Sequence, residues 1–401
     1  MMDVLIFDAI RTPRGKGKAG GSLAGLAPYE LIRQLVAAIA DRHGPQVNAA
    51  VERLALGCVT QVGPQGGHLA LVSRILAGLP DTAVSVTLNN YCVSGMSAVA
   101  SAARAIVTGE ESLALGGGVE SMSQASFEAD GATFFTDAAL AASLSYVPPP
   151  IVADWLATQE GITRAELDEV TVDSHQRAGR AWSNGRYAST VVPVLRPDGS
   201  RVERDELIRP QLSVTDLARF APAFGALGAT GSDAYLTRTV SGLREVKHLH
   251  AIPHCPPISD GAALLLIGSR HGGAAVGLQP RARLALIAEV HTDLKKPFAA
   301  GFAALARLLE RSRLALRDLG AIEFMEAFAA VPATFMRTYD VNPELVNASG
   351  GHLAMGHPMG ASGAILIATL LAEMERRDVE WGAAIAHAVS GVGCGVLLQR
   401  V

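Results

Sequence analysis

The sequence has little of several features that mark large classes of protein. It contains only four cysteines in 401 residues, at positions 58, 92, 255 and 394, and no two of them have C-x-x-C spacing. This scarcity predicts a reducing compartment and argues against a disulfide framework or a zinc site built from paired cysteines. The 34 Lys and Arg against 38 Asp and Glu give a net charge of −4. Without a basic excess, we expect neither nucleic acid nor an anionic membrane surface as a partner.

Long hydrophobic runs are also absent. No apolar stretch is long enough to cross a bilayer, and the first residues lack the basic leader and cleavage site of a secretory signal. We therefore expect a cytoplasmic protein without a membrane span. The chain is 49% hydrophobic and contains 41 glycines, which indicates a well-packed globular protein. Its length predicts two or more domains.

One stretch, VSVTLNNYCVSGMSAVASAARAIVTG from Val84 to Gly109, organises the rest. Val84–Leu88 is a β-branched and apolar run, which predicts a buried strand. The small residues after Cys92 predict a helix that is packed closely on nearly all sides. Cys92 then lies where a strand turns into a helix, and the free N–H groups and dipole there favour a thiolate. We interpret Cys92 as a nucleophile.

The remaining chain alternates strand-like and helix-like segments, which predicts an α/β protein with helices on both faces of its sheet. A strand is expected over residues 112–117, followed by a glycine turn at 116–118. Residues 122–250 are more charged and include the Pro148-Pro149-Pro150 break and the hairpin-like segment RPDGSRV, which suggests an insertion over the core. The C-terminal half repeats the order of loop, small-residue helix, strand and glycine turn seen around Cys92. This order predicts two similar halves with a site between them.

The sequence resembles the thiolase family over nearly its whole length. The resemblance is carried by DAIRTPRG near the start, NNYCVSGMSAV around Cys92, GGGVESMS at 116–123, SDGAALLL at 259–266, EAFA at 326–329 and GGHLAMGHPMGASGA at 350–364. It implies a duplicated five-layered α/β/α/β/α thiolase fold with an inserted loop domain. The corresponding domains are an N-terminal half at 1–122, completed by about 251–280, a loop domain at 123–250 and a C-terminal half at 281–401. Homodimers or homotetramers are common in such enzymes.

The resemblance also implies an activity. Thiolases make or break the carbon–carbon bond of a 3-ketoacyl-CoA, and they carry the acyl group on the cysteine that matches Cys92. Splitting the transfer into two half-reactions lets one pocket serve both acyl acceptors. His357, within Gly-His-Pro, matches the histidine that activates this cysteine. Coenzyme A enters as the thioester substrate, and no other cofactor is implied.

Two catalytic positions depart from the family pattern. The family loop Asn-Glu-Ala-Phe begins here with Met325, and a methionine side chain cannot donate the hydrogen bond that the asparagine gives to a water. Ungapped alignment from Gly382 places His387 at the family's second catalytic cysteine, whereas a two-residue shift would place Val389 there. His387 is then either an acid/base that replaces the cysteine or a satisfied polar group at a strand end. Cys394 lies beyond this position, and we interpret it as structural.

The coenzyme-binding motifs depart as well. Pro148-Pro149-Pro150 stands where the family has His-Met-Gly, and Pro253-His254-Cys255-Pro256 stands where it has Gly-Asn-x-Ser. The nearby histidines His248 and His250, with His254 and Cys255, suggest a metal site by their closeness. No second pair completes a ligand set, so we predict no metal there.

Three functional hypotheses follow from these residues. The first is a thiolase-type acyltransferase that works through a Cys92 acyl-enzyme. The second is a biosynthetic, ketosynthase-like condensing enzyme with a Cys-His-His set made of Cys92, His357 and His387. The third is a non-catalytic thiolase-like subunit that binds acyl-CoA. Intact Cys92 and His357 favour an enzyme, whereas Met325 and the missing second cysteine favour the others.

Overall fold

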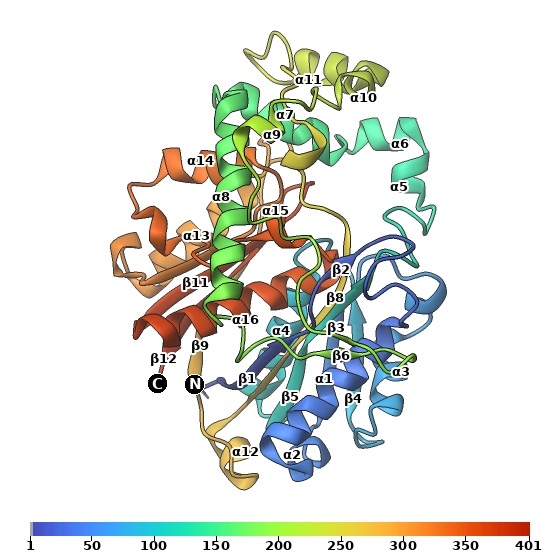
Figure 1. The fold of residues 1–401 in the computed structure, drawn as a ribbon. Helices are drawn as coiled ribbons and strands as arrows, with labels where there is room; N and C mark the ends of the chain where they lie inside the picture. The colour runs from blue at the N-terminus through green and yellow to red at the C-terminus, as the bar shows by residue number, and fades with distance from the viewer. Residues whose placement is uncertain (1–2) are drawn as a thin grey trace.

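The computed structural model describes residues 3–401, and all of its strands except those of one small hairpin form a continuous path through the molecule (Figure 1). The path runs β4-β3-β5-β8-β1-β9-β12-β11-β10, and a short strand, β2, pairs with β8. The bounds are β1 Leu5–Arg11, β2 Gly15–Lys16, β3 Arg53–Gly57, β4 Val84–Leu88, β5 Leu113–Ser121, β8 Ser259–Gly268, β9 Ala282–His291, β10 Ala321–Phe324, β11 Trp381–His387 and β12 Val392–Arg400.

The path consists of two halves with the same order of pairings. In the first half, β1 pairs with β8 and β8 with β5 in antiparallel fashion, and β5 with β3 and β3 with β4 in parallel. In the second, β9 pairs with β12 and β12 with β11 in antiparallel fashion, β11 with β10 in parallel, and a parallel bridge joins Ile322 to Val346. The halves meet at β1 and β9 through only two residue pairs. The predicted duplication is therefore confirmed.

The longer helices build layers around these two halves. Helices α4 and α16 lie together in the middle, α1 and α3 cover the outer face of the first half, and α13 covers that of the second. This arrangement gives the five α/β/α/β/α layers. Helices outside residues 123–250 have the bounds α1 Pro28–His43, α2 Pro45–Ala49, α3 Leu69–Leu76, α4 Ser94–Thr108, α12 Arg270–Ala275, α13 Ala299–Ser312, α14 Ala330–Thr338, α15 His352–Met355 and α16 Met359–Arg377.

Small residues allow the two middle helices to approach each other closely. A Cβ added at Gly95 of α4 would lie 2.6 Å from the carbonyl oxygen of Gly360, and one added at Gly363 would lie 2.6 Å from the backbone nitrogen of Met96. Backbone atoms cannot yield at such distances, so each crossing point requires glycine. The small-residue composition after Cys92 thus sets how closely the two halves approach.

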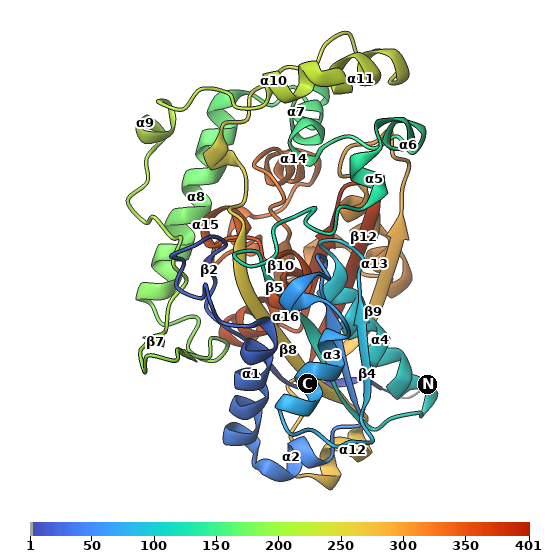
Figure 2. The ribbon, with the colours of Figure 1, turned by 90° about the vertical axis from the view of Figure 1, so that its right-hand side faces the viewer.

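Residues 123–250 form short helices, one long helix and a small hairpin. Figures 1 and 2 show most of this segment above one end of the strands, while α8 descends along the side. Helix α8 begins with a capping box, in which Thr163 and Glu166 satisfy each other's backbone N–H groups. Strands β6 and β7 confirm the expected hairpin. The bounds are α5 Thr133–Thr136, α6 Ala138–Ser143, α7 Pro149–Gln159, α8 Arg164–Ser183, β6 Val194–Leu195, β7 Arg201–Val202, α9 Val214–Leu217, α10 Gly225–Leu227 and α11 Asp233–Thr239.

Two local expectations are wrong. Strand β4 has the predicted bounds but is the edge strand of its half and is not buried; Val84 is 45% exposed. The glycines at 116–118 lie inside β5 and do not form a turn. They are needed there for another reason, since Cβ atoms added at these positions would meet the backbone of Val99, Ala263 and Gly360. Within residues 3–401, no helix is both long enough and apolar enough to cross a membrane.

Candidate active site

Cys92 lies on a tight turn between β4 and α4, as its sequence context predicts. Tyr91, just before it, has φ 49°, a left-handed conformation that non-glycine residues seldom adopt. The Ser94 hydroxyl holds the turn because it accepts the Asn90 N–H at 2.8 Å and donates to the Tyr91 carbonyl at 2.6 Å. The turn thus places the thiol just ahead of the first turn of α4.

His357 reaches Cys92 from the corresponding turn of the second half. Its Nε2 lies 3.1 Å from Cys92 Sγ, and its Nδ1 lies 2.8 Å from the Ser362 hydroxyl. Because a thiol donates to Nε2, the neutral imidazole carries its proton on Nδ1 and donates it to Ser362. The structure therefore joins two predicted site residues that are 265 positions apart in the chain.

Burial determines the charge of this pair. It raises the pKa of the Cys92 thiol to about 12, with a further contribution from the Glu120 carboxylate. Burial also lowers the pKa of His357 to about 3, with help from His387 and Arg14. The resting pair is thus a thiol beside a neutral imidazole. The thiolate expected from the helix N-terminus alone is wrong, because removal from water outweighs the helix dipole and the backbone donor.

Glu120 is a buried carboxylate in this region to which the sequence reasoning assigned no role. It accepts the N–H groups of Val59, Thr60 and Gly360 at 2.9–3.1 Å, and an amide N–H of Gln65 at 2.9 Å. Burial raises its pKa despite these donors. It ties the first turn of α16 to the loop after β3. An acidic residue at the end of a glycine-rich, otherwise apolar strand is the signal that would have revealed it.

His387 is the last residue of β11 and is fully buried. Its Nε2 lies 3.1 Å from the carbonyl oxygen of Met325, and its ring packs against Phe298 and Phe324 at centroid distances of 5.4 and 5.5 Å. Since a carbonyl oxygen only accepts, Nε2 carries the proton and Nδ1 presents a lone pair, for which the described residues offer no partner. Burial lowers the pKa of His387 to about 4.

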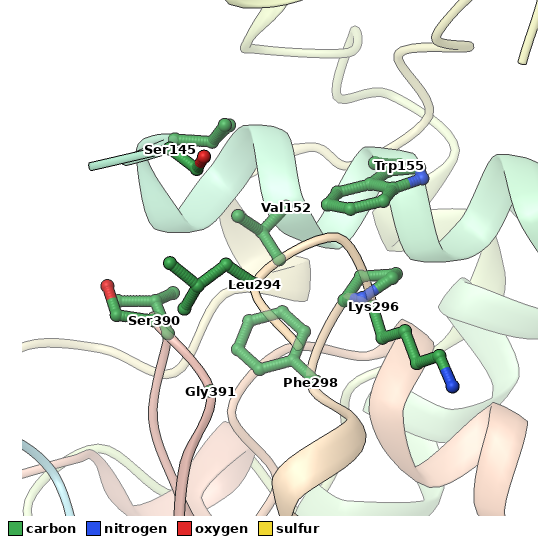
Figure 3. Close-up of a pocket in the computed structure, with 11 residues that line it drawn as sticks. Ser145, Val152, Trp155, Leu294, Lys296, Phe298, Ser390 and Gly391 are labelled. Atoms are coloured by element: carbon green, nitrogen blue, oxygen red, sulfur yellow. The ribbon is translucent and has the colours of Figure 1, made fainter. Parts of the chain in front are cut away.

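Phe298 also lines a small pocket (Figure 3). It is narrow, with room for little more than one water molecule, and most of the side chains around it are apolar. Val152 and Trp155 come from α7, Leu294 and Phe298 from the segment before α13, and Val389–Gly391 from the turn after His387. The space is too small to hold an acyl chain in this conformation.

The histidines near Cys255 are each paired with a carboxylate. His248 and His250 contact Asp154 at 2.9 and 2.7 Å, and His254 contacts Asp168 at 2.7 Å. Across residues 3–401, no group of three His, Cys, Asp or Glu side chains is arranged to hold a metal ion. All four cysteines are free thiols, and Cys394 is buried within β12.

Comparison with known proteins agrees with this geometry. The sequence profile of the thiolase N-terminal domain matches residues 4–234, and that of the thiolase C-terminal domain matches residues 278–400. The chain is 33% identical to the β-ketoadipyl-CoA thiolase of Pseudomonas aeruginosa over 420 residues, covering 100% of this chain and 99% of the other. It is also 33% identical to the 3-ketoacyl-CoA thiolase of Photorhabdus laumondii over 415 residues, covering both chains completely.

The fold is also similar to that of a solved structure. The acetyl-CoA acetyltransferase of Bacillus anthracis superimposes with a TM-score of 0.85 at 27% identity, covering 100% of this chain and 99% of that one. Two matching domain profiles, full-length relatives and a shared fold lead to one conclusion: this chain belongs to the thiolase family.

Proposed function

We propose that this acyltransferase acts on acyl-CoA thioesters through an acyl-enzyme on Cys92, and that it makes or breaks the carbon–carbon bond of a 3-ketoacyl-CoA. The 3.1 Å contact between Cys92 Sγ and His357 Nε2 carries the proposal. The Ser362 hydroxyl leaves Nε2 of the imidazole free to accept a proton. A nucleophile, a base and a group that orients the base form the arrangement that acyl transfer requires.

In the first half-reaction, Cys92 Sγ attacks the thioester carbonyl while its proton passes to His357 Nε2. The bond between the carbonyl carbon and the coenzyme sulphur then breaks, and His357 returns the proton to that sulphur. Cys92 keeps the acyl group and CoA leaves as a thiol. Because His357 has a pKa of about 3, its protonated form is a strong acid that readily gives up the proton.

The carbon–carbon step needs a base for the substrate α-carbon and donors for the enolate oxygen. We assign the base to His387 Nδ1, which presents a lone pair in a site walled by Phe298 and Phe324. The enolate charge that forms beside this ring would stabilise its protonated form. Met325 offers no side-chain donor, and loss of one oxyanion donor costs about 10²–10³ in rate. Thiolytic cleavage by CoA should therefore be slow, whereas acyl transfer to Cys92 survives.

Substitution His387→Ala should reduce exchange of acyl-CoA α-protons with deuterated water by about 10²-fold or more, because the base is lost. Acylation of Cys92 should stay within about threefold, because His387 contacts neither Cys92 Sγ nor His357 by hydrogen bond. Proton NMR of the acyl-CoA follows the exchange, and release of CoA follows acylation. The variant His271→Ala is a suitable control, since His271 lies on α12 away from this site. Unchanged exchange in His387→Ala would remove His387 from the mechanism.

Mixing the protein with acetyl-CoA tests the proposed function itself. We expect a burst of free CoA close to one equivalent per chain, followed by slow turnover when a second acyl-CoA or a 3-ketoacyl-CoA is supplied. A condensing enzyme of ketosynthase type would form the 3-ketoacyl product and show little thiolysis. A non-catalytic subunit would bind the acyl-CoA and release no CoA.

We also propose the oligomeric state of the protein, the role of residues 123–250, the coenzyme it uses and its place in the cell. Edge strand β4 and the exposed side chains of α3, Leu71, Val72, Ile75 and Leu76, suit an interface with a second copy of the chain. A homodimer or homotetramer would cover them. Residues 123–250 act as an inserted loop domain, the thioester is the only coenzyme involved, no metal resides in the site, and the protein works in the cytoplasm.

A further inference from the structure

Arg14 is a buried cation that none of the steps above uses. It is 1% exposed and lies just beyond β1. Its Nη1 donates to the carbonyl oxygen of Gly356 at 2.9 Å, and its Nη2 lies 3.3 Å from the sulphur of Met355. The residue that follows Gly356 is His357, so Arg14 binds the turn that carries the imidazole.

The peptide group between Gly356 and His357 is held at both of its polar atoms. Arg14 binds the Gly356 carbonyl oxygen, and the His357 backbone N–H donates to the Pro257 carbonyl at 2.8 Å. Gly356 has φ 94°, a left-handed conformation suited to glycine. With the plane of this peptide fixed on both sides, the direction in which the His357 side chain leaves the backbone is fixed too.

Arg14 is itself held by a residue of the 123–250 segment, Asp205. Its backbone N–H donates to Asp205 Oδ1 at 2.8 Å, and its Nε lies 3.7 Å from the same oxygen. Asp205 also binds Arg11 through two hydrogen bonds, at 2.7 and 2.8 Å. The backbone of the residue that binds the His357 turn is thus anchored by Asp205, which lies outside both halves of the thiolase core and carries a charge opposite to that of the guanidinium.

Arg14 also affects the charge around His357. The titratable groups near this imidazole are Cys92, His352 and His387, with Glu120 close to Cys92. Burial lowers the pKa of Arg14 to about 10, which still leaves it positive at neutral pH. A fixed positive charge disfavours a second one on His357, so it promotes return of the proton to the leaving coenzyme sulphur.

We propose that Arg14 is a positioning residue for His357, because it clamps the Gly356–His357 peptide and places a permanent cation near the imidazole. This inference rests on the proposed function, since it assigns Arg14 a part in the same proton transfer. It also links the segment containing Asp205 to the acylation step through one side chain.

Three substitutions test the proposal: Arg14→Met removes both charge and donor, Arg14→Gln keeps an amide donor without the charge, and Arg14→Lys keeps the charge. Arg177→Met is the matched control, because Arg177 is also buried and binds backbone carbonyls, those of Pro343 and Val346. In single-turnover acylation by acetyl-CoA, Arg14→Met should be slower by about 10²-fold with KM within about threefold. Arg14→Lys should recover much of the rate, and Arg177→Met should stay near that of the native chain.

The pH profile separates positioning from simple loss of stability. The acid limb of acylation should move to higher pH in Arg14→Met and Arg14→Gln, and it should stay in place in Arg14→Lys. If Arg14→Met does not fold, Arg14→Gln decides the outcome. Native-like acylation and an unmoved acid limb in the neutral variants would overturn the proposal, as would equal losses in Arg14→Met and Arg177→Met.

A second reaction keeps this test separate from that of the proposed function. Alkylation of Cys92 by iodoacetamide needs His357 but no acyl-CoA. If acetyl-CoA fails to acylate the native chain, the proposed function fails, yet slower alkylation in Arg14→Met than in Arg177→Met would still support the role of Arg14. Equal alkylation rates in these two variants would contradict it.

Discussion

Substitution Cys92→Ala is expected to abolish acyl transfer, with a loss of at least about 10⁴-fold in the rate of CoA release from acetyl-CoA. The reason is that the described structure brings no other thiol to the histidine. His357 Nε2 faces Cys92 Sγ at 3.1 Å, whereas Cys58 contacts Glu120 and Cys394 lies within β12. Burial also raises the pKa of Cys58 and Cys394, and within the described residues neither sulphur is hydrogen-bonded to a histidine that could take its proton.

Two further variants strengthen this test. Cys92→Ser keeps the shape of the turn but offers a hydroxyl, a much weaker nucleophile for a thioester, so its rate should fall nearly as far. Cys394→Ala should acylate at close to the native rate. A Cys92→Ala protein that still releases a full equivalent of CoA in the burst would show that another group carries the acyl chain.

Substitution His357→Gln is expected to slow acylation by about 10³-fold while acetyl-CoA still binds. Cys92 is a thiol at rest, because its pKa is about 12, and attack on the thioester therefore requires a base to take the proton as the bond forms. Glutamine can fill the space next to Ser362 but cannot accept and return a proton in this way. Single-turnover CoA release against acetyl-CoA concentration separates the rate constant from binding.

The pKa of His357 also predicts how the rate of acylation depends on pH. Since that pKa is about 3, the imidazole stays neutral as pH falls from 8 to 5, and native acylation should lose no rate over this range from protonation of the base. A fall centred near pH 6.5 would show that His357 titrates like an exposed histidine, which would contradict a thiol resting beside a neutral imidazole.

Sequence motifs predicted that Cys92 and His357 lie in one site, but they did not predict how far that site is removed from water. Cys92 and His357 each sit in a turn that leads into a small-residue helix, so the repeated order of elements placed both at one site before any contact was known. Their protonation states could not be predicted this way. Burial depends on segments such as the loop after β3, which lie far from both residues in the sequence.

The same limit explains the local errors. The composition of Val84–Leu88 is that of a core strand, and nothing within those five residues shows that its second neighbour is missing. Three consecutive glycines usually indicate a turn, but in β5 they allow the close approach of β8 and α16. Arg14 binds a backbone carbonyl, which leaves no pattern in a single sequence, whereas Glu120 did leave one as an acidic residue at the end of a glycine-rich strand.

The most direct test of a Cys92 acyl-enzyme is to locate the acyl group on the protein. The native chain is mixed with acetyl-CoA, quenched in acid, digested and analysed by mass spectrometry of its four cysteine-containing regions. A single acetyl group on the peptide that contains Cys92, absent from the Cys92→Ala protein, is the predicted result. Acetylation of Cys58, Cys255 or Cys394 with Cys92 unmodified would contradict the account.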